Sequence, residues 1–448
     1  MKFIKDTFIY FGTTVLNQLI PFILIPIITR QFTTDDVGVL SMFTIFNLIF
    51  STISSLSLNS YLQYIYYRKP EEVPVAIFNI FLVSAVTNTL LGFLNGYAFQ
   101  ELNALQDIPN FYIWWIPVSS FFSLSYFIYL TLLRNRKKSL EFGVLSTLMT
   151  ISNLVLSLYL IYYTDLSWES RSIPALVLPV FFGCYTFYKL AQSGDLIFKP
   201  DLNLIKKAFL YSLPLLVVVL LEQALNLSDR YIIDYYLGKS DVGIYDMGYK
   251  IGALVFVAIN AFNLVFVPKV YEYFSQLEKK ESEQDSKHET DLLKHDIVSF
   301  FHLYLLIIII ITIGVLLLGK LLFLIEFFDP KFEDSFIVVT PVAFGYLFYG
   351  LYTISSVIIG QTFKTYYNVI VVSIGIAINL GLNILYIPKY GNIVAAWSTL
   401  LTCVVMYIIT FSMAYKIIPL PWFKFSTIHH SVKVFKKIIS RPLKTPNI

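Results

Sequence analysis

Residues 297–319 read IVSFFHLYLLIIIIITIGVLLLG, a run without a single Asp, Glu, Lys or Arg. The hydrocarbon core of a bilayer is about 30 Å thick, and roughly 20 apolar residues in an α-helix cross it. This stretch therefore predicts a membrane-spanning helix. The rest of the chain agrees, because 57% of its 448 residues are hydrophobic and only 14% are charged. A soluble domain carries about 25% charged residues.

The same length criterion, applied outward from this run, predicts twelve spans in two sets of six. The first set covers residues 7–29, 37–60, 74–99, 111–133, 140–163 and 172–192. The second set covers residues 207–229, 241–268, 297–319, 335–360, 366–387 and 391–415. The sequence thus predicts an all-α integral membrane protein of about twelve helices, with one lobe over 1–195 and a second over 196–418. The polar segment 275–297 is predicted to be a mobile, charged cytoplasmic loop.

Basic residues predict the orientation of these spans. With the N-terminus inside, 25 of the 33 Lys and Arg residues fall on cytoplasmic segments and 7 on the opposite loops. Cytoplasmic loops of membrane proteins carry such an excess. We therefore expect both termini in the cytoplasm, with the basic, amphipathic tail 419–448 lying on the inner leaflet.

A short sequence is repeated after the first and the seventh span. Asp36-Val37-Gly38 precedes Val39-Leu40-Ser41-Met42, and Asp241-Val242-Gly243 precedes Ile244-Tyr245-Asp246-Met247. The two copies stand at corresponding places in the two sets of six spans, which indicates duplication. Because six spans return the chain to the same side, the halves are parallel repeats, related by a pseudo-twofold axis along the membrane normal.

Several longer motifs resemble a known family, the polysaccharide (O-antigen, Wzx-type) flippases of the multidrug/oligosaccharidyl-lipid/polysaccharide exporter superfamily. The most specific match is Tyr211-Ser212-Leu213-Pro214, followed by Asp229-Arg230-Tyr231-Ile232-Ile233 and Gly243-Ile244-Tyr245. Further matches are Ile25-Pro26-Ile27-Ile28-Thr29-Arg30, Phe266-Val267-Pro268-Lys269, Asn379, Asn383 and Ile387-Pro388-Lys389-Tyr390-Gly391.

The resemblance implies a bacterial exporter with a MATE-like pair of lobes around a cationic cavity. Such a protein turns a polyprenyl-diphosphate-linked oligosaccharide from the inner to the outer leaflet of the cytoplasmic membrane, for cell-surface polysaccharide synthesis. Its expected partners are the bilayer, the lipid-linked sugar and the polysaccharide polymerase and chain-length machinery, and not a nucleic acid. No cofactor is expected beyond a proton or sodium gradient.

The diphosphate of such a substrate needs positive charge, and three intramembrane or span-end cations are candidates to supply it. Arg30 and Arg230 close spans 1 and 7, where they are either diphosphate ligands or interfacial anchors. Lys250 lies inside span 8, one turn after Asp246. That pair either contributes to the cavity or is purely structural.

Polar residues recur along span 7 at helical spacing. Glu222, Asn226 and Asp229 are separated by four and three residues and share one face of an otherwise apolar helix. Asn226 is a candidate sugar or diphosphate ligand. Glu222 and Asp229 are candidates for ion coupling, because intramembrane carboxylates generally face water, although Glu222 is equally well explained as the partner of a basic neighbour.

Other functions are less well supported. The chain has no GxxxxGK[ST], HExxH or GxSxG motif, so we expect neither an enzyme nor catalytic residues. Its two cysteines, Cys184 and Cys403, show no metal-ligand spacing, and no metal is expected. A drug exporter of the same superfamily and a non-transporting scaffold of a glycan assembly complex remain alternatives.

Overall fold

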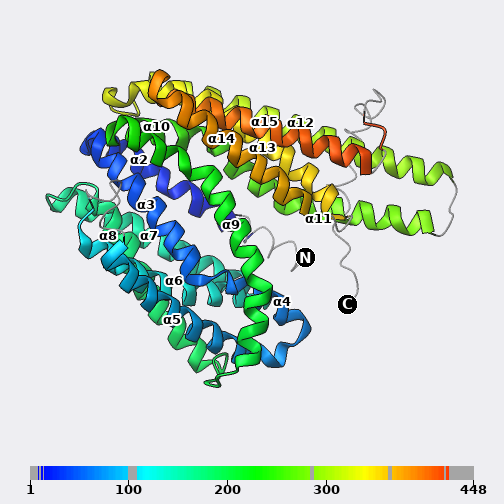
Figure 1. The fold of residues 1–448 in the computed structure, drawn as a ribbon, viewed down its shortest axis with the longest axis horizontal. Coiled ribbons are helices and arrows are strands. Elements are labelled where there is room, and N and C mark those ends of the chain that lie inside the picture. The colour runs from blue at the N-terminus through cyan, green and yellow to red at the C-terminus, as the bar shows by residue number, and fades with distance from the viewer. Residues whose placement is uncertain are drawn as a thin grey trace. The chain divides into compact units, whose positions relative to one another are not determined.

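The computed structural model describes residues 9, 12–13, 15–98, 108–282, 287–361, 366–417 and 420–422. Helices account for nearly all of this part of the chain (Figure 1). They are η1 (Ile20–Leu24), α2 (Ile25–Gln31), α3 (Thr34–Ser55), α4 (Leu58–Arg68), η2 (Pro70–Glu72), α5 (Val73–Ala98), α6 (Asn110–Asn135), α7 (Ser139–Tyr163), α8 (Glu169–Gln192), α9 (Leu202–Leu237), α10 (Lys239–Gly252), α11 (Leu254–Ser282), α12 (Lys287–Leu324), η4 (Pro330–Ser335), α13 (Phe336–Gln361), α14 (Tyr366–Tyr390) and α15 (Ile393–Ile417).

The prediction of an all-α protein with about twelve spans is confirmed. In the described residues, eleven helices are long and apolar enough to cross a membrane, and Val15–Gln31 is a shorter apolar helix at the place of the first predicted span. Pro21 and Pro26 lie in the first turns of η1 and α2. Proline lacks an N–H donor and crowds the preceding turn, which explains why this segment changes from a 3₁₀ to an α geometry.

One predicted span has an internal break, and one predicted loop is helical. The span expected at 241–268 comprises α10 and α11, which meet at Ala253, and Lys239–Asn263 is long and apolar enough to cross a membrane. The loop expected at 275–297 is mostly helical, because α11 continues to Ser282 and α12 begins at Lys287, with 283–286 outside the described residues. This segment contains no Gly or Pro and is rich in Glu, Lys and Leu, which favour helix over an open loop. From residue 423 on, the predicted amphipathic tail lies outside the described residues.

The chain folds into two compact units, which are described separately here. The first contains residues 1–247, 326–335 and 383–394, and the second contains 248–325, 336–382 and 395–448. Residues 196–247 group with the first unit because α9 packs against α3, α4 and α5. A lobe boundary at 195/196 therefore stays a prediction drawn from the span count.

Helices α6 and α8 pack closely against each other in the first unit. A Cβ atom on Gly183 would lie only 2.3 Å from the carbonyl oxygen of Phe122. Beside it, the hydroxyl groups of Ser125 and Thr186 are 3.1 Å apart and fully buried. Lipid tails are as apolar as leucine, so close contact between small residues and interhelical hydrogen bonds stabilise such a pair.

The end of α6 is tied to the segment after α8 by a bidentate ion pair. Arg136 donates two hydrogen bonds to the carboxylate of Asp195. One runs from Nη1 to Oδ2 at 2.8 Å, and the other runs from Nη2 to Oδ1. Ser193 donates to Asp195 Oδ2 at 2.6 Å. Desolvation raises the pKa of Asp195, but the hydrogen bonds from Arg136 and Ser193 outweigh it, so the pKa lies below its ordinary value.

Three long helices form the centre of the second unit. Helices α11 and α12 run side by side, and both pack on α13 (Figure 1). A Cβ atom on Gly350 of α13 would lie 2.8 Å from Ile259 and 3.0 Å from Ile308. The Tyr304 hydroxyl of α12 donates to Asn263 Oδ1 of α11 at 2.8 Å, which links the two helices.

The predicted internal repeat is confirmed by equivalent contacts in its two copies. Asp36 Oδ1 accepts a hydrogen bond of 2.8 Å from Ser167 Oγ, just before α8. Asp241 Oδ1 accepts one of 2.9 Å from Asn392 Nδ2, just before α15. In the first half, Asp36 at the start of α3 thus holds the start of α8. In the second half, Asp241 at the start of α10 holds the start of α15 in the same way.

The two repeat-related helix starts also contact each other, within the first unit. A Cβ atom on Gly38 of α3 would lie 2.0 Å from the Lys239 carbonyl oxygen, and one on Gly243 of α10 would lie 2.1 Å from the Thr34 carbonyl oxygen. Ser240 Oγ donates to Thr34 Oγ1 at 2.7 Å. Each glycine therefore lies against the residue that stands four places before the other, as a twofold relation requires.

Candidate functional site

Four buried polar side chains meet between α9 and α10. Arg230 Nη2 lies 3.1 Å from Asp246 Oδ1, and the guanidinium also lies 5.2 Å from the centre of the Tyr245 ring. The Tyr245 hydroxyl donates to Asp229 Oδ2 at 2.5 Å. Each of the four residues is at most 6% exposed. Asp229 pairs with Tyr245, and the next residue, Arg230, pairs with Asp246. Two adjacent residues of α9 thus contact two adjacent residues of α10.

This cluster brings together three of the predicted site residues: Asp229, Arg230 and Asp246. Tyr245 completes it, although sequence reasoning did not select that tyrosine. A buried charge is tolerated when an opposite charge and hydrogen bonds compensate it, and Arg230 and Asp246 compensate each other in this way. In this conformation Arg230 is a structural link between α9 and α10 rather than a surface anchor. A role for these residues in binding or ion coupling stays a prediction.

The other predicted site residues lie elsewhere. Arg30 is exposed in the last turn of α2, and its Nη2 donates to the Glu326 carbonyl oxygen at 3.3 Å. Lys250 is half-buried on the part of α10 that belongs to the second unit. The side chains of Glu222 and Asn226 lie outside the part of the chain that the structure describes.

Arg171 is a half-buried cation that sequence reasoning missed. It was counted with the loop between spans 5 and 6, but it lies in the first turn of α8 and is half-buried. Its Nη1 donates to Asn153 Oδ1 at 2.9 Å and to Ser157 Oγ at 2.8 Å, both on α7. A signal was available, because Asn153 and Ser157 stand four residues apart and therefore share one face of the predicted span 140–163.

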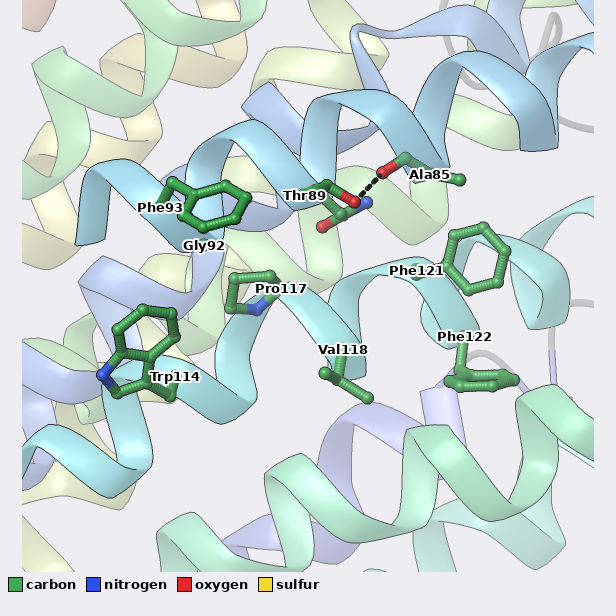
Figure 2. Close-up of a pocket in the computed structure, with 10 residues that line it drawn as sticks. Ala85, Thr89, Gly92, Phe93, Trp114, Pro117, Val118, Phe121 and Phe122 are labelled. Carbon is green, nitrogen blue, oxygen red and sulfur yellow. Dashed lines mark hydrogen bonds between the residues drawn. The ribbon is translucent and has the colours of Figure 1, made fainter. Parts of the chain in front are cut away.

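An apolar groove of about 430 Å³ lies between α5 and α6 (Figure 2). Phe93 and Trp114 flank one part of it, and Phe121 and Phe122 flank another (Figure 2). No charged side chain lines the groove, and the Thr89 hydroxyl is bonded to the Ala85 carbonyl oxygen at 2.8 Å. The groove therefore suits a hydrocarbon chain and not a diphosphate or a charged sugar.

Among the described residues, no group of three or more His, Cys, Asp or Glu side chains is placed to hold a metal ion. The candidate site residues are the α9–α10 cluster, Arg30, Lys250, and Arg171 with its α7 partners.

Comparison with known proteins identifies the family. The family model described as "Polysaccharide biosynthesis protein" matches residues 3–278. The chain belongs to this polysaccharide biosynthesis protein family. A relative from Haemophilus influenzae named "Lsg locus putative protein 1" is 22% identical over 281 residues, which cover 62% of this chain and 68% of the relative.

Solved structures show which fold this polysaccharide biosynthesis protein has. The lipid II flippase MurJ in an inward closed conformation aligns with a TM-score of 0.68 and 14% identity, covering 99% of this chain and 94% of MurJ. An inward-facing multidrug resistance MATE family transporter of the MOP superfamily aligns with a TM-score of 0.65 and 12% identity, covering 94% and 96% of the two chains. The predicted MATE-like fold of two six-helix repeats is confirmed.

Proposed function

We propose that the protein is a flippase, which moves a polyprenyl-diphosphate-linked oligosaccharide from the inner to the outer leaflet of the cytoplasmic membrane. The observation that carries the proposal is the combination of a polysaccharide biosynthesis family with the fold of a lipid II flippase. A family member with an exporter fold and without a recognisable catalytic motif has transport of the sugar carrier as its simplest role.

The substrate explains why a protein of this kind is needed. Its sugar and diphosphate are insoluble in the hydrocarbon core, where even the lower estimates put the transfer of one charged side chain at about 2.5–3.5 kcal/mol. A protein lowers this barrier by offering cations and hydrogen-bond donors in a wet path. Arg30, which is exposed, and Lys250, which is half-buried, remain the proposed cations for the diphosphate.

The reciprocal contact between α3 and α10 supports a transport cycle. In this structure the two helix starts touch through the backbone at Gly38 and Gly243, so no substrate passes between them. A flippase alternates between states that open to one side and then to the other. We expect this contact to be made in one such state and broken in another.

The decisive experiment reconstitutes the full chain in vesicles with a fluorescent polyprenyl-diphosphate oligosaccharide. The assay measures accessibility of the sugar in the outer leaflet over time. Wild type should flip the lipid, Arg30→Ala and Lys250→Ala should slow it at least tenfold, and Arg134→Ala should not, because Arg134 is an exposed residue in the last turn of α6. If wild type leaves the lipid in its original leaflet, the proposal is wrong.

A drug exporter is the second candidate, because the fold is shared with multidrug MATE transporters. The same vesicles, loaded with a cationic dye, separate the two functions. A flippase leaves the dye distribution unchanged, whereas a drug exporter concentrates it across the membrane. A scaffold without transport moves neither substrate, and replacing Lys250 would leave surface glycan intact.

Two further parts of the proposal concern energy and place. We propose that a proton or sodium gradient drives the cycle through Glu222 or Asp229, and that both termini lie in the cytoplasm. Reporter fusions at each terminus test the orientation. Co-purification with the polysaccharide polymerase and chain-length proteins tests the expected partners.

A further inference from the structure

The side chain of Arg171 points along α7 toward the interior of the spanning segment. Its partners Ser157 and Asn153 stand six and ten residues before Tyr163, the end of α7. At about 1.5 Å per residue these positions lie roughly 9 and 15 Å from that helix end. An interfacial arginine turns toward the nearer water layer. Arg171 does the opposite, which favours a role inside the protein.

The partners of Arg171 differ in kind from those of the other enclosed bases. Arg136, Arg230 and Lys239 each have a carboxylate partner: Asp195, Asp246 and Asp234 respectively. Arg171 is held by an amide and a hydroxyl group, and among the described residues no carboxylate forms an ion pair with it. Its positive charge is therefore positioned without being neutralised.

A carboxylate is available nearby but is used elsewhere. Glu169, two residues earlier in α8, accepts a hydrogen bond from Ser167 Oγ at 3.4 Å. Two residues apart on a helix are on different faces, so Glu169 does not share the face of Arg171. The nearest carboxylate in sequence thus leaves the guanidinium charge in place.

One edge of the guanidinium is still able to bind a ligand. Both hydrogen bonds come from Nη1, whereas Nε and Nη2 donate to none of the described residues. Neither atom is among the fully buried nitrogens that lack a partner, so each keeps some accessible area on a half-buried residue. The Nε–Nη2 edge is the planar fork that gives arginine two parallel hydrogen bonds to a phosphate. The hydroxyl of Ser157 and the amide of Asn153 fix the orientation of this fork.

We propose that Arg171, oriented by Asn153 and Ser157, binds the phosphate oxygens of an anionic ligand within the first unit. On the proposed function, on which this assignment rests, the ligand is the diphosphate of the lipid-linked sugar. A free phosphate or pyrophosphate has the same chemistry and is the other source of such oxygens. The alternative is that Arg171 is only a structural link, or strut, between α7 and α8. A strut needs the hydrogen bonds to Asn153 and Ser157, but it does not need a positive charge that is accessible and not neutralised by a carboxylate.

Equilibrium binding to the purified full chain tests the site directly, without transport. The probes are a radiolabelled polyprenyl diphosphate, inorganic pyrophosphate and an uncharged polyprenol. We expect Arg171→Gln to weaken binding of the polyprenyl diphosphate roughly ten- to hundredfold, as the loss of a charge-assisted hydrogen bond predicts. Arg171→Lys should lose less, because it keeps the charge but not the fork. Polyprenol binding should not change, and Arg134→Gln should match wild type.

Asn153→Asp separates a ligand site from a strut. The carboxylate would pair with Arg171 at the distance of the present amide, so it would preserve or strengthen the link between α7 and α8. A ligand site then loses anion binding while thermal stability is kept, because the charge is neutralised in place. If Asn153→Asp binds the polyprenyl diphosphate as well as wild type does, Arg171 is a strut and the inference fails. This variant keeps the test decisive even where Arg171→Gln does not fold.

The outcomes distinguish this inference from the proposed function. If wild type flips the lipid but Arg171→Gln and Asn153→Asp bind the anion as wild type does, the proposed site is wrong and the proposed function stands. Anion binding that depends on Arg171, in a protein that does not flip, supports the site and overturns the function. Binding of pyrophosphate alone, with no gain from the polyprenyl chain, supports the phosphate site and assigns it to a soluble anion.

Discussion

Replacing either glycine of the α3–α10 contact with alanine should force the two helix starts apart. In Gly38→Ala the new Cβ atom would lie 2.0 Å from the Lys239 carbonyl oxygen, and in Gly243→Ala it would lie 2.1 Å from that of Thr34. Such contacts in real proteins are essentially never under 3.0 Å, so the backbones must separate by about 1 Å. Overpacking of this kind costs about 1–3 kcal/mol.

The control for this prediction is another glycine in a helix. Gly314 of α12 has open space where its Cβ would be. Alanine favours helix over glycine by about 0.5–1 kcal/mol, and this gain applies to Gly314→Ala and Gly38→Ala alike. The difference between the two variants therefore isolates the steric cost, and Gly38→Ala should be about 1–3 kcal/mol less stable than Gly314→Ala.

The measurement is unfolding of the purified chain in mixed micelles. In the double variant Gly38→Ala/Gly243→Ala, the second substitution should cost less than the first, because one separation of the helix starts relieves both clashes. Equal stability of Gly38→Ala and Gly314→Ala would refute the contact. Strict additivity of the two single changes would refute its reciprocal geometry.

Three further predictions concern charged groups. Arg230→Ala should destabilise the protein by about 3–5 kcal/mol, because it removes the guanidinium that forms the buried ion pair with Asp246, and Arg230→Leu/Asp246→Leu should lose less than Arg230→Ala in the same unfolding assay. Asp195→Asn should be less stable than wild type at neutral pH. Since the folded pKa of Asp195 lies below the ordinary 3.8, that difference should persist at higher pH and shrink as the pH falls below about 3.8. Glu222→Gln should abolish the dependence of flipping on a proton or sodium gradient, and unchanged dependence would remove Glu222 from the coupling role.

The fold was largely predictable because a membrane imposes a simple rule on the sequence. Each span must be long and apolar, so runs such as 297–319 mark helices without knowledge of their neighbours. The duplication was equally visible, since Asp36 and Asp241 begin matching segments. The failures occurred where no membrane constraint acts: the charged segment 275–297 was expected to be an open loop, and its helix propensity was overlooked.

The site was less predictable, because helical periodicity relates residues only within one helix. It placed Asp246 near Lys250, four residues along, but did not reveal the ion pair of Asp246 with Arg230, sixteen residues away on another helix. Arg171 was missed for the same reason. It stands just before the predicted span 172–192, and only the packing of α8 on α7 shows that its guanidinium contacts Asn153 and Ser157.

The contact between Gly38 and Gly243 constrains how this chain can vary. Because each glycine lies against the other's helix start, a bulkier residue in one copy displaces the backbone of both, and neither position can drift by itself. Before the two halves were joined in one gene, the same surface would have met its own copy in a dimer, where a single change would have struck twice. Fusion gave the two sides separate codons, so each glycine can mutate by itself. A substitution at one glycine still displaces the helix start that contains the other.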